Sequence, residues 1–381
     1  MVKINGHDQH QNPTLFFNIY ILLTLLMSYS GQAFVVYPMF IAVLILFMNK
    51  LRYDLFDMTM VLLILIFSTL KFIVEGSIPS SLFTLKYFFG FIIFYMLFRQ
   101  KFYFLKINFN FLLITISLVL ILEAVLINTI LPAILWPNFP KGPGGELGHP
   151  GLFFGFYQRP YGIGTNASVT TTLIVCLLLI RDKVNLSACK ISRFASFVSV
   201  IAVIISISGL GLFLIVMYYA FKKIRFSRIV LTLLVFIGLY FIIFAIIPNK
   251  GNLFEWFNKI SPNYFKYLIQ LKTKEITEAC HLNYTLRDLL FGKKWFIGDP
   301  VPLGGHFGLL NFAIYGGLIT LLLYMRIIIK RFNRYNFLIL LTLIVGAIHY
   351  AGIFTTPGQL IFAFALAFDK KKLEIYKVNI V

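Results

Sequence analysis

Ionisable side chains gather in one stretch of the chain, Tyr284–Leu318, directly before and within an apolar segment. This stretch carries Arg287, Asp288, Asp299 and His306 among several glycine and proline residues. The arginine guanidinium binds phosphate oxygens bidentately and stays charged, and an unperturbed histidine titrates at about pH 6.5. Beside a membrane, such residues could stabilise an anionic leaving group and remove a proton from a hydroxyl.

The composition predicts a membrane around this stretch. Of the 381 residues, 59% are apolar and only 13% are charged, and the mean hydropathy is +0.87. This composition excludes a soluble domain. One membrane span takes about 20 residues, so the length accommodates roughly ten to twelve spans. We therefore predict an all-α polytopic membrane protein, in which residues 1–381 form a single integral membrane domain.

Twelve apolar segments are candidate spans. They cover Leu15–Ser28, Ala33–Met48, Phe56–Val74, Leu82–Phe98, Phe109–Leu131, Ala167–Ile180, Ile191–Ile207, Gly209–Phe221, Ile229–Ile247, Phe307–Ile329, Asn336–Ile353 and Gln359–Phe368. A ten-span alternative joins each of the short pairs, at 191–221 and 336–368, into one span.

The basic residues decide between these topologies. With twelve spans and both termini in the cytoplasm, the segments rich in Lys and Arg all face the cytoplasm, as the positive-inside bias requires. Ten spans would expose the clusters Lys222–Arg228 and Arg326–Arg334 on the outer face. The net charge of +20 is therefore interpreted as a topology signal, and nucleic acid is not an expected partner.

Twelve spans leave two long loops outside, Pro132–Thr165 and Pro248–Gly305. The first carries Glu146 and Arg159, and the second contains most of the polar stretch described above. The cysteines show neither disulfide nor metal-ligand spacing, and the outer loops carry no evident carboxylate cluster for a metal. We expect no metal and no other cofactor.

Charged residues also lie inside predicted spans. Lys71, Lys86 and Glu123, with Glu75 at the membrane edge, all fall in the outer half of the bundle under this topology. Charges at membrane depth usually face protein or water, so they predict a polar, substrate-binding cavity that opens to the outside. The alternative is that the lysines snorkel to the interface and that a neighbour neutralises Glu123.

Three motifs follow one another on the outer side of the predicted bundle. An outer loop ends in Arg-x-x-Gly and Asn before a span, a short serine hairpin follows, and a second long loop leads into a glycine-rich helix. The residues of these motifs are Arg159, Gly162, Asn166, Ser206, Ser208, Gly209, Arg287, Gly292, His306, Leu310, Gly316 and Gly317. In the order and sidedness of these motifs, the chain resembles the O-antigen polymerase and O-antigen ligase superfamily.

The chain departs from this pattern at two positions. Members of the superfamily often carry an Arg after the hairpin serines, where this chain has Leu210. The ligase branch usually has Asn after the loop histidine, where this chain has Phe307. The first departure removes one expected phosphate contact, and the second weighs against a ligase.

The resemblance implies a polysaccharide polymerase in the cytoplasmic (inner) membrane of a bacterium, making O-antigen, the glycan of lipopolysaccharide, or capsule. Such an enzyme transfers a glycan from a polyprenyl diphosphate, such as undecaprenyl diphosphate, to an acceptor sugar at the outer face. Besides the lipid bilayer, its expected partners are the lipid-linked donor and acceptor, a chain-length regulator and a flippase.

The residues expected to carry this chemistry are Arg159 and Arg287 for the diphosphate and His306 for the base. If His306 is not the base, the alternative bases are Asp288, Asp299 and Glu146. Structural alternatives are that the arginines pair with lipid phosphates and that His306 caps a helix. An O-antigen ligase shares the chemistry and differs in its acceptor, and a lipid-linked glycan flippase or other transporter is the non-enzymatic alternative.

Overall fold

The computed structural model describes residues 13–26, 36–38, 41, 54–99, 107–129, 159–164, 166–184, 192–223, 270, 273–274, 276–277, 280–281, 283–294, 308–350 and 352–367. All regular elements in these ranges are helical, which confirms the predicted all-α class. The first half contains α1 (Pro13–Leu26), α3 (Leu55–Glu75), α4 (Ile78–Thr84), a π-helical turn (Leu85–Phe89), α5 (Phe91–Phe98), α7 (Phe109–Thr129) and α8 (Ala167–Val184). The second half contains α9 (Arg193–Ile205), α10 (Gly209–Lys223), α14 (Leu286–Phe291), α15 (Gly308–Arg331), α16 (Phe337–His349), a 3₁₀ turn (Gly352–Phe354) and α17 (Thr356–Ala367).

Three of these helices, α3, α7 and α15, are long and apolar enough to cross a membrane. Shorter apolar helices accompany them, and their positions follow the predicted spans. The predicted span Ile229–Ile247 and most of Ala33–Met48 lie outside the described residues. The helices therefore support a helical membrane protein, while the number of spans stays a prediction.

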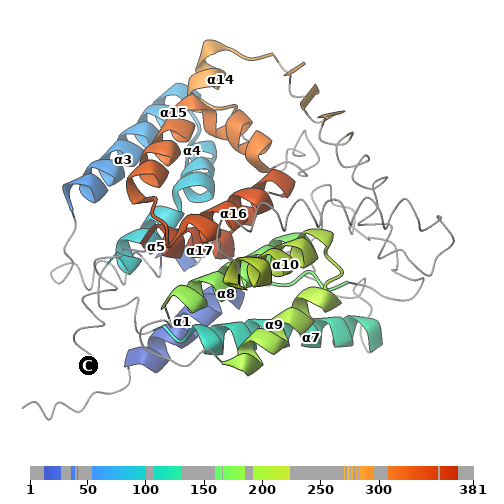
Figure 1. The fold of residues 1–381 in the computed structure, drawn as a ribbon. Helices are drawn as coiled ribbons and strands as arrows, with labels where there is room; N and C mark the ends of the chain where they lie inside the picture. Colours follow the sequence, from blue (N-terminus) through green and yellow to red (C-terminus); the bar gives the residue numbers. More distant parts are fainter. Residues whose placement is uncertain are drawn as a thin grey trace, which may run out of the picture.

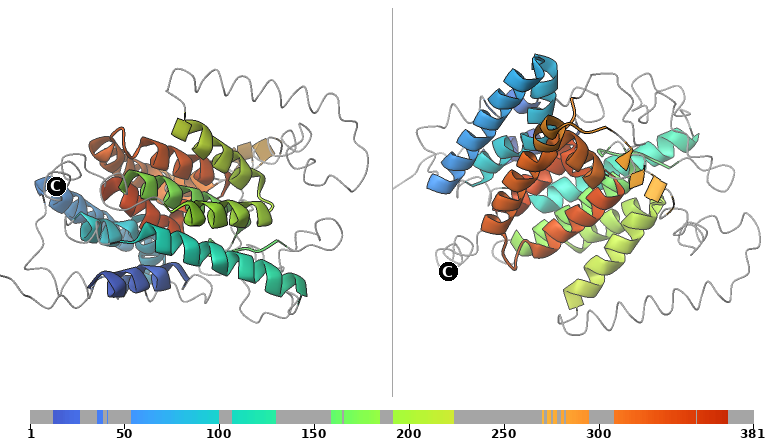
Figure 2. Two further views of the ribbon diagram at one scale, coloured as in Figure 1. Left: turned by 60° about the horizontal axis from the view of Figure 1, so that its bottom comes forward. Right: turned by 90° about the horizontal axis from the view of Figure 1, so that it is seen from above.

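The helices form two groups joined by a central layer. Helices α7, α8, α9 and α10 lie together, and α3, α4 and α15 form the second group (Figure 1). Between them lie α5, α16 and α17, and α17 contacts both α5 and α8. The two further views show the same arrangement (Figure 2).

A charged cluster of ion pairs joins the start of α3 to the ends of α5 and α15. Asp54 caps the start of α3 by accepting a hydrogen bond from the backbone N–H of Asp57 at 2.8 Å. Arg99, which follows α5, donates to both carboxylates at 3.0 and 3.2 Å, and Arg331, which ends α15, donates to them at 2.7 and 2.5 Å. The basic ends of α5 and α15 therefore lie beside the start of α3.

The predicted span Leu82–Phe98 is interrupted where the chain forms the π-helical turn. Side-chain donors from distant helices hold the carbonyls of this turn. Gln359 Nε2 donates to the carbonyls of Lys86 and Tyr87 at 2.8 and 2.7 Å, and the Tyr324 hydroxyl donates to the Phe88 carbonyl. Helices α15 and α17 are thereby bonded to the turn, and the Lys86 carbonyl also accepts from the Gly90 N–H at 3.1 Å.

Helices α16 and α17 differ from the predicted spans at their junction. Helix α16 ends at His349, before the predicted Ile353, and α17 begins at Thr356, before the predicted Gln359. The 3₁₀ turn between them is packed so tightly that a Cβ at Gly358 would collide with the Gly352 carbonyl. The reversal of the chain is therefore sharp.

Candidate functional site

Arg287 lies on the short helix α14, whose start is fixed by local chemistry. The Thr285 side chain accepts a hydrogen bond from the Asp288 N–H, and the Asp288 carboxylate accepts one from the Thr285 N–H, forming a capping box. Burial raises the pKa of Asp288, but these hydrogen bonds outweigh it and the net shift is downward. Asp288 therefore acts as a helix cap here, and Arg287 beside it is exposed.

The backbone at the end of α14 packs against a kink in α15. Gly292 has φ +82°, and Gly317, inside α15, has φ +70°, both in the left-handed region that favours glycine. A Cβ at Gly292 would collide with the Tyr315 backbone, and a Cβ at Gly317 would collide with the backbone of Gly292 and lie 2.6 Å from the Leu290 carbonyl oxygen. Two backbones can meet here because both residues are glycine.

The kink leaves carbonyls of α15 without the partners that a continuous helix would supply. The Lys293 N–H donates to the Ile314 carbonyl at 2.8 Å. Lys71 Nζ, from α3, donates to the Tyr315 carbonyl at 3.3 Å and to the Phe291 carbonyl at 2.5 Å. Lys71 thus joins α3, α14 and α15 at one point.

Lys71 also forms an ion pair with Glu75, one turn further along α3. The distance from Nζ to Oε1 is 3.1 Å, and the two side chains are 1% and 0% exposed. Lys294 Nζ donates to the Glu75 carbonyl at 3.3 Å. The substrate-binding role predicted for Lys71 stays a prediction, but two carbonyls and one carboxylate already account for its burial.

Glu123 on α7 holds the turn that carries Arg159, the other arginine predicted to bind the diphosphate. Glu123 is 4% exposed, and its carboxylate accepts from the N–H of Tyr161 at 2.8 Å and of Gly162 at 3.1 Å. Burial raises the pKa of Tyr161, and Arg159 and Glu123 act on it in opposite directions because both lie nearby. Gly162 has φ +69°, which completes the turn. The buried charge at Glu123 therefore anchors the turn that carries Arg159.

The first two motifs of the resemblance meet at the start of α8. Ser208, between α9 and α10, donates to the Ser168 hydroxyl at 3.1 Å and lies 3.3 Å from the Thr171 hydroxyl. Asn166 caps α8 by accepting from the Ser168 N–H at 2.8 Å. Ile207 in the hairpin has φ +45°, an uncommon conformation for a β-branched residue. Ser208 of the hairpin therefore bonds to the first turns of α8, which directly follow the turn that carries Arg159.

Contacts at the two ends of α16 show how the start of α8 lies relative to α15 and to α14 beside it. At the start of α16, Asn336 Nδ2 donates to the Arg331 carbonyl at the end of α15. Towards the other end of α16, a Cβ on Gly346 would lie 2.7 Å from the Thr172 side chain near the start of α8. The kinked half of α15 and the start of α8 therefore lie toward the same end of the bundle, with α16 between them (Figure 1).

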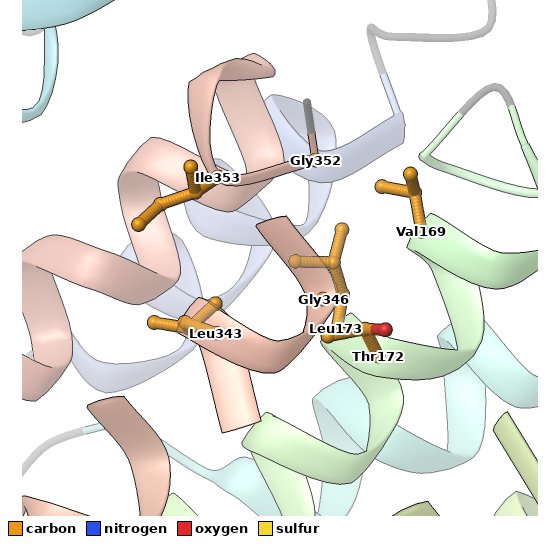
Figure 3. A pocket seen from close by; sticks show the side chains of 7 residues that line it. All are labelled: Val169, Thr172, Leu173, Leu343, Gly346, Gly352 and Ile353. Atoms are coloured by element: carbon orange, nitrogen blue, oxygen red, sulfur yellow. The ribbon is translucent and has the colours of Figure 1, made fainter. Parts of the chain in front are cut away.

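A small hollow lies between α8, α16 and the 3₁₀ turn (Figure 3). Its volume of about 10 Å³ is close to the least that one water molecule needs. Its lining is apolar apart from a threonine and consists of Val169, Thr172, Leu173, Leu343, Gly346, Gly352 and Ile353. This space is too small to hold a sugar.

Lys86 and Gln359 meet at the π-helical turn. The Lys86 side chain is exposed, while its carbonyl accepts from Gln359. Gln359 is 1% exposed and also accepts from the Tyr37 hydroxyl at 2.7 Å. Sequence reasoning missed Gln359, although a polar residue opening an otherwise apolar helix was the signal that could have identified it.

His306, Glu146 and Asp299 lie outside the residues that the structure describes, so their predicted roles stay predictions. In the described ranges, no three His, Cys, Asp or Glu side chains are grouped to hold a metal ion. The structure places Arg287, Asp288 and Lys71 where α3, α14 and α15 meet, and Arg159 and Glu123 where α7 meets the turn before α8.

Comparison with known proteins adds no relative: no family model, no curated protein sequence and no solved structure matches this chain.

Proposed function

We propose that this protein is a polysaccharide polymerase that transfers a polyprenyl-diphosphate-linked glycan onto an acceptor sugar. The observation that carries the proposal is that two arginine-bearing segments are held toward one end of an apolar helical bundle. Lys71 ties the α14 segment of Arg287, and Glu123 ties the turn of Arg159. A donor with a membrane-embedded lipid would present its diphosphate at such an end.

The chemistry assigns a separate task to each residue. The acceptor hydroxyl attacks the anomeric carbon, the bond from that carbon to the diphosphate oxygen breaks, and the leaving diphosphate carries the negative charge. Arg287 and Arg159 offset that charge through bidentate hydrogen bonds. His306 takes the proton of the hydroxyl. Lys71 and Glu123 act as positioning residues because their charged atoms are already bonded to the protein.

The topology proposed with this function has twelve spans, with both termini in the cytoplasm of a bacterium and α14 outside. Support comes from the cluster of Asp54, Asp57, Arg99 and Arg331, which collects predicted cytoplasmic cations at the end opposite Lys71. Cys280 is exposed and precedes α14. In a protein with the other two cysteines replaced, an impermeant thiol reagent should label Cys280 from outside intact cells. Labelling only after the cytoplasmic side is opened would reject this orientation.

The function is tested by the lipid-linked material that a defective variant accumulates. Arg159→Ala should leave single lipid-linked repeat units on the outer face, because delivery across the membrane precedes polymerisation. Repeat units trapped on the inner face would instead support a flippase. Full-length polymer that is not attached to its final acceptor would support a ligase.

A further inference from the structure

The C-terminal part of α15 carries cations that the charged cluster does not neutralise. Arg99 and Arg331 bond to both carboxylates of the charged cluster, Asp54 and Asp57. Arg326 and Lys330 have no carboxylate within ion-pair distance in the part of the chain that the structure describes. Their charges therefore call for a partner outside this set.

Arg326 and Lys330 lie one turn apart on the same face of α15, and both side chains are exposed. Next to them, Leu322 is 58% exposed and Ile329 is 68% exposed. Large apolar side chains at such exposure mark the lipid-facing side of a membrane helix. Arg326 lies five residues before the end of α15, about 7.5 Å along the helix axis. Its side chain must therefore extend toward the C-terminal end of α15 for the guanidinium to reach the lipid headgroups.

Phe56 on α3 lies beside both cations. The Arg326 guanidinium carbon is 6.0 Å and Lys330 Nζ is 5.9 Å from the centre of its ring. The Arg331 guanidinium carbon lies 5.2 Å from the same ring centre, so three like charges gather at Phe56. Of the three, only Arg331 pairs with a carboxylate of the described residues. An anion between Arg326 and Lys330 would relieve their repulsion and accept hydrogen bonds from both.

We propose that Arg326, Lys330 and Phe56 form a binding site for the phosphate of an anionic phospholipid. The two cations bind the phosphate, Phe56 orients them, and the acyl chains lie along the exposed apolar faces of α15 and α3. The lipid belongs to the leaflet at the Asp54 end, opposite the end that carries Arg287, so this site is separate from the proposed polymerase site.

The test compares lipid binding of the purified full-length protein by native mass spectrometry. The probes are phosphatidylglycerol and phosphatidylcholine with the same acyl chains. A membrane-surface cation contributes roughly fivefold in affinity for anionic lipid, so Arg326→Gln with Lys330→Gln should weaken phosphatidylglycerol binding by about 25-fold. Phosphatidylcholine binding should stay unchanged.

The matched control removes two cations that lie on other helices, Lys183→Gln on α8 with Arg193→Gln on α9, and should keep most of the selectivity for phosphatidylglycerol. The exchange Arg326→Lys with Lys330→Arg keeps both charges and should retain binding, which separates loss of the site from loss of the fold. Equal loss in the Gln pair and its control would overturn the proposal, as would full binding by the Gln pair. Competition by glycerol 3-phosphate as strong as by the intact lipid would also overturn it, because a free phosphate would then suffice.

Discussion

Gly292 and Gly317 approach each other so closely that neither position has room for a methyl group. The position of the segment after α14 therefore depends on the kink of α15, because only the kinked backbone leaves room for it. Ile314 and Tyr315 expose carbonyls at the kink, and donors from Lys293 and Lys71 bind them. Through these contacts, the position of Arg287 depends on a break inside a membrane helix.

Replacing either glycine of this pair should destabilise the protein more than replacing an unconfined glycine. Gly292→Ala and Gly317→Ala each carry the backbone cost of a positive φ, about 1–2 kcal/mol, and a collision worth about 1–3 kcal/mol more. Gly76→Ala is the control, because Gly76 has φ +61° but nothing within 4 Å of an added Cβ. Unfolding titrations with SDS in mixed micelles measure the difference. Equal effects at all three positions would show that the close approach does not exist.

Removing the charge of Lys71 should cost more than removing its ion pair as a whole. Lys71→Met leaves the buried Glu75 carboxylate unpaired and two carbonyls without their donor, and should lower the free energy of unfolding by about 3–5 kcal/mol. The double change Lys71→Met with Glu75→Leu should recover part of this loss. The same titration reports both. A double variant less stable than Lys71→Met would contradict the ion pair.

Glu123 should affect activity through the turn that it anchors. Glu123→Ala removes the acceptor for the Tyr161 and Gly162 N–H groups and should lower polymer formation nearly as far as Arg159→Ala. Glu123→Gln keeps a carbonyl oxygen for these N–H groups and should lose less. Thr129→Val, on the same helix, is the control because the Thr129 hydroxyl bonds only locally, to the Val125 carbonyl. An active Glu123→Ala protein would reject the anchoring role.

The helices themselves could be predicted from the sequence because apolar runs such as those in α3 and α7 leave one outcome in a membrane. The kink at Gly317 could not, since a Gly-Gly pair permits a break without requiring one. The contact that uses the break comes from the end of α14, a separate helix earlier in the same polar stretch. Lys71 was identified by its charge at membrane depth, but the sequence does not show that its partners are backbone carbonyls.

The predicted site is described only in part. Residue type and position along the spans selected Arg287, Asp288, Arg159, Lys71 and Glu123. The sequence predicted that the charged residues at membrane depth line one cavity. In the structure, Lys71 bonds to α14 and α15, and Glu123 bonds to the turn that carries Arg159. Thr285-x-x-Asp is a sequence signature of a helix cap, so the capping role of Asp288 was readable from the chain. The π-helical turn depends on packing between helices and had no comparable local signal.

Acid should weaken the charged cluster that holds α3, α5 and α15 together. Burial raises the pKa of Asp54, but hydrogen bonds from Arg331 and Asp57 and the charges of Arg331 and Arg99 outweigh it, and the pKa falls to about 2. A lowered pKa means that the stabilisation is complete above the unfolded value of about 3.9 and is lost as pH falls through about 2.

Stability measured from pH 5 down to about pH 2 should therefore decline less steeply in Asp54→Asn than in the unchanged protein. Asp288→Asn offers a comparison outside this cluster, because the carboxylate of Asp288 bonds only to the cap of α14. An identical acid slope in Asp54→Asn and the unchanged protein would show that Asp54 is not paired in solution.

The most direct measurement is the rate of chain extension by purified protein in lipid nanodiscs, supplied with a lipid-linked repeat unit. Arg287→Lys keeps the charge but loses the planar fork and should reduce the rate about 10²-fold, while Arg193→Lys, exposed and remote from α14, should match the unchanged protein. His306→Ala should reduce the rate about 10²- to 10⁴-fold and flatten a rise with pH centred at about 6 to 7. Extension at the unchanged rate by both Arg287→Lys and His306→Ala would contradict the proposed polymerase mechanism.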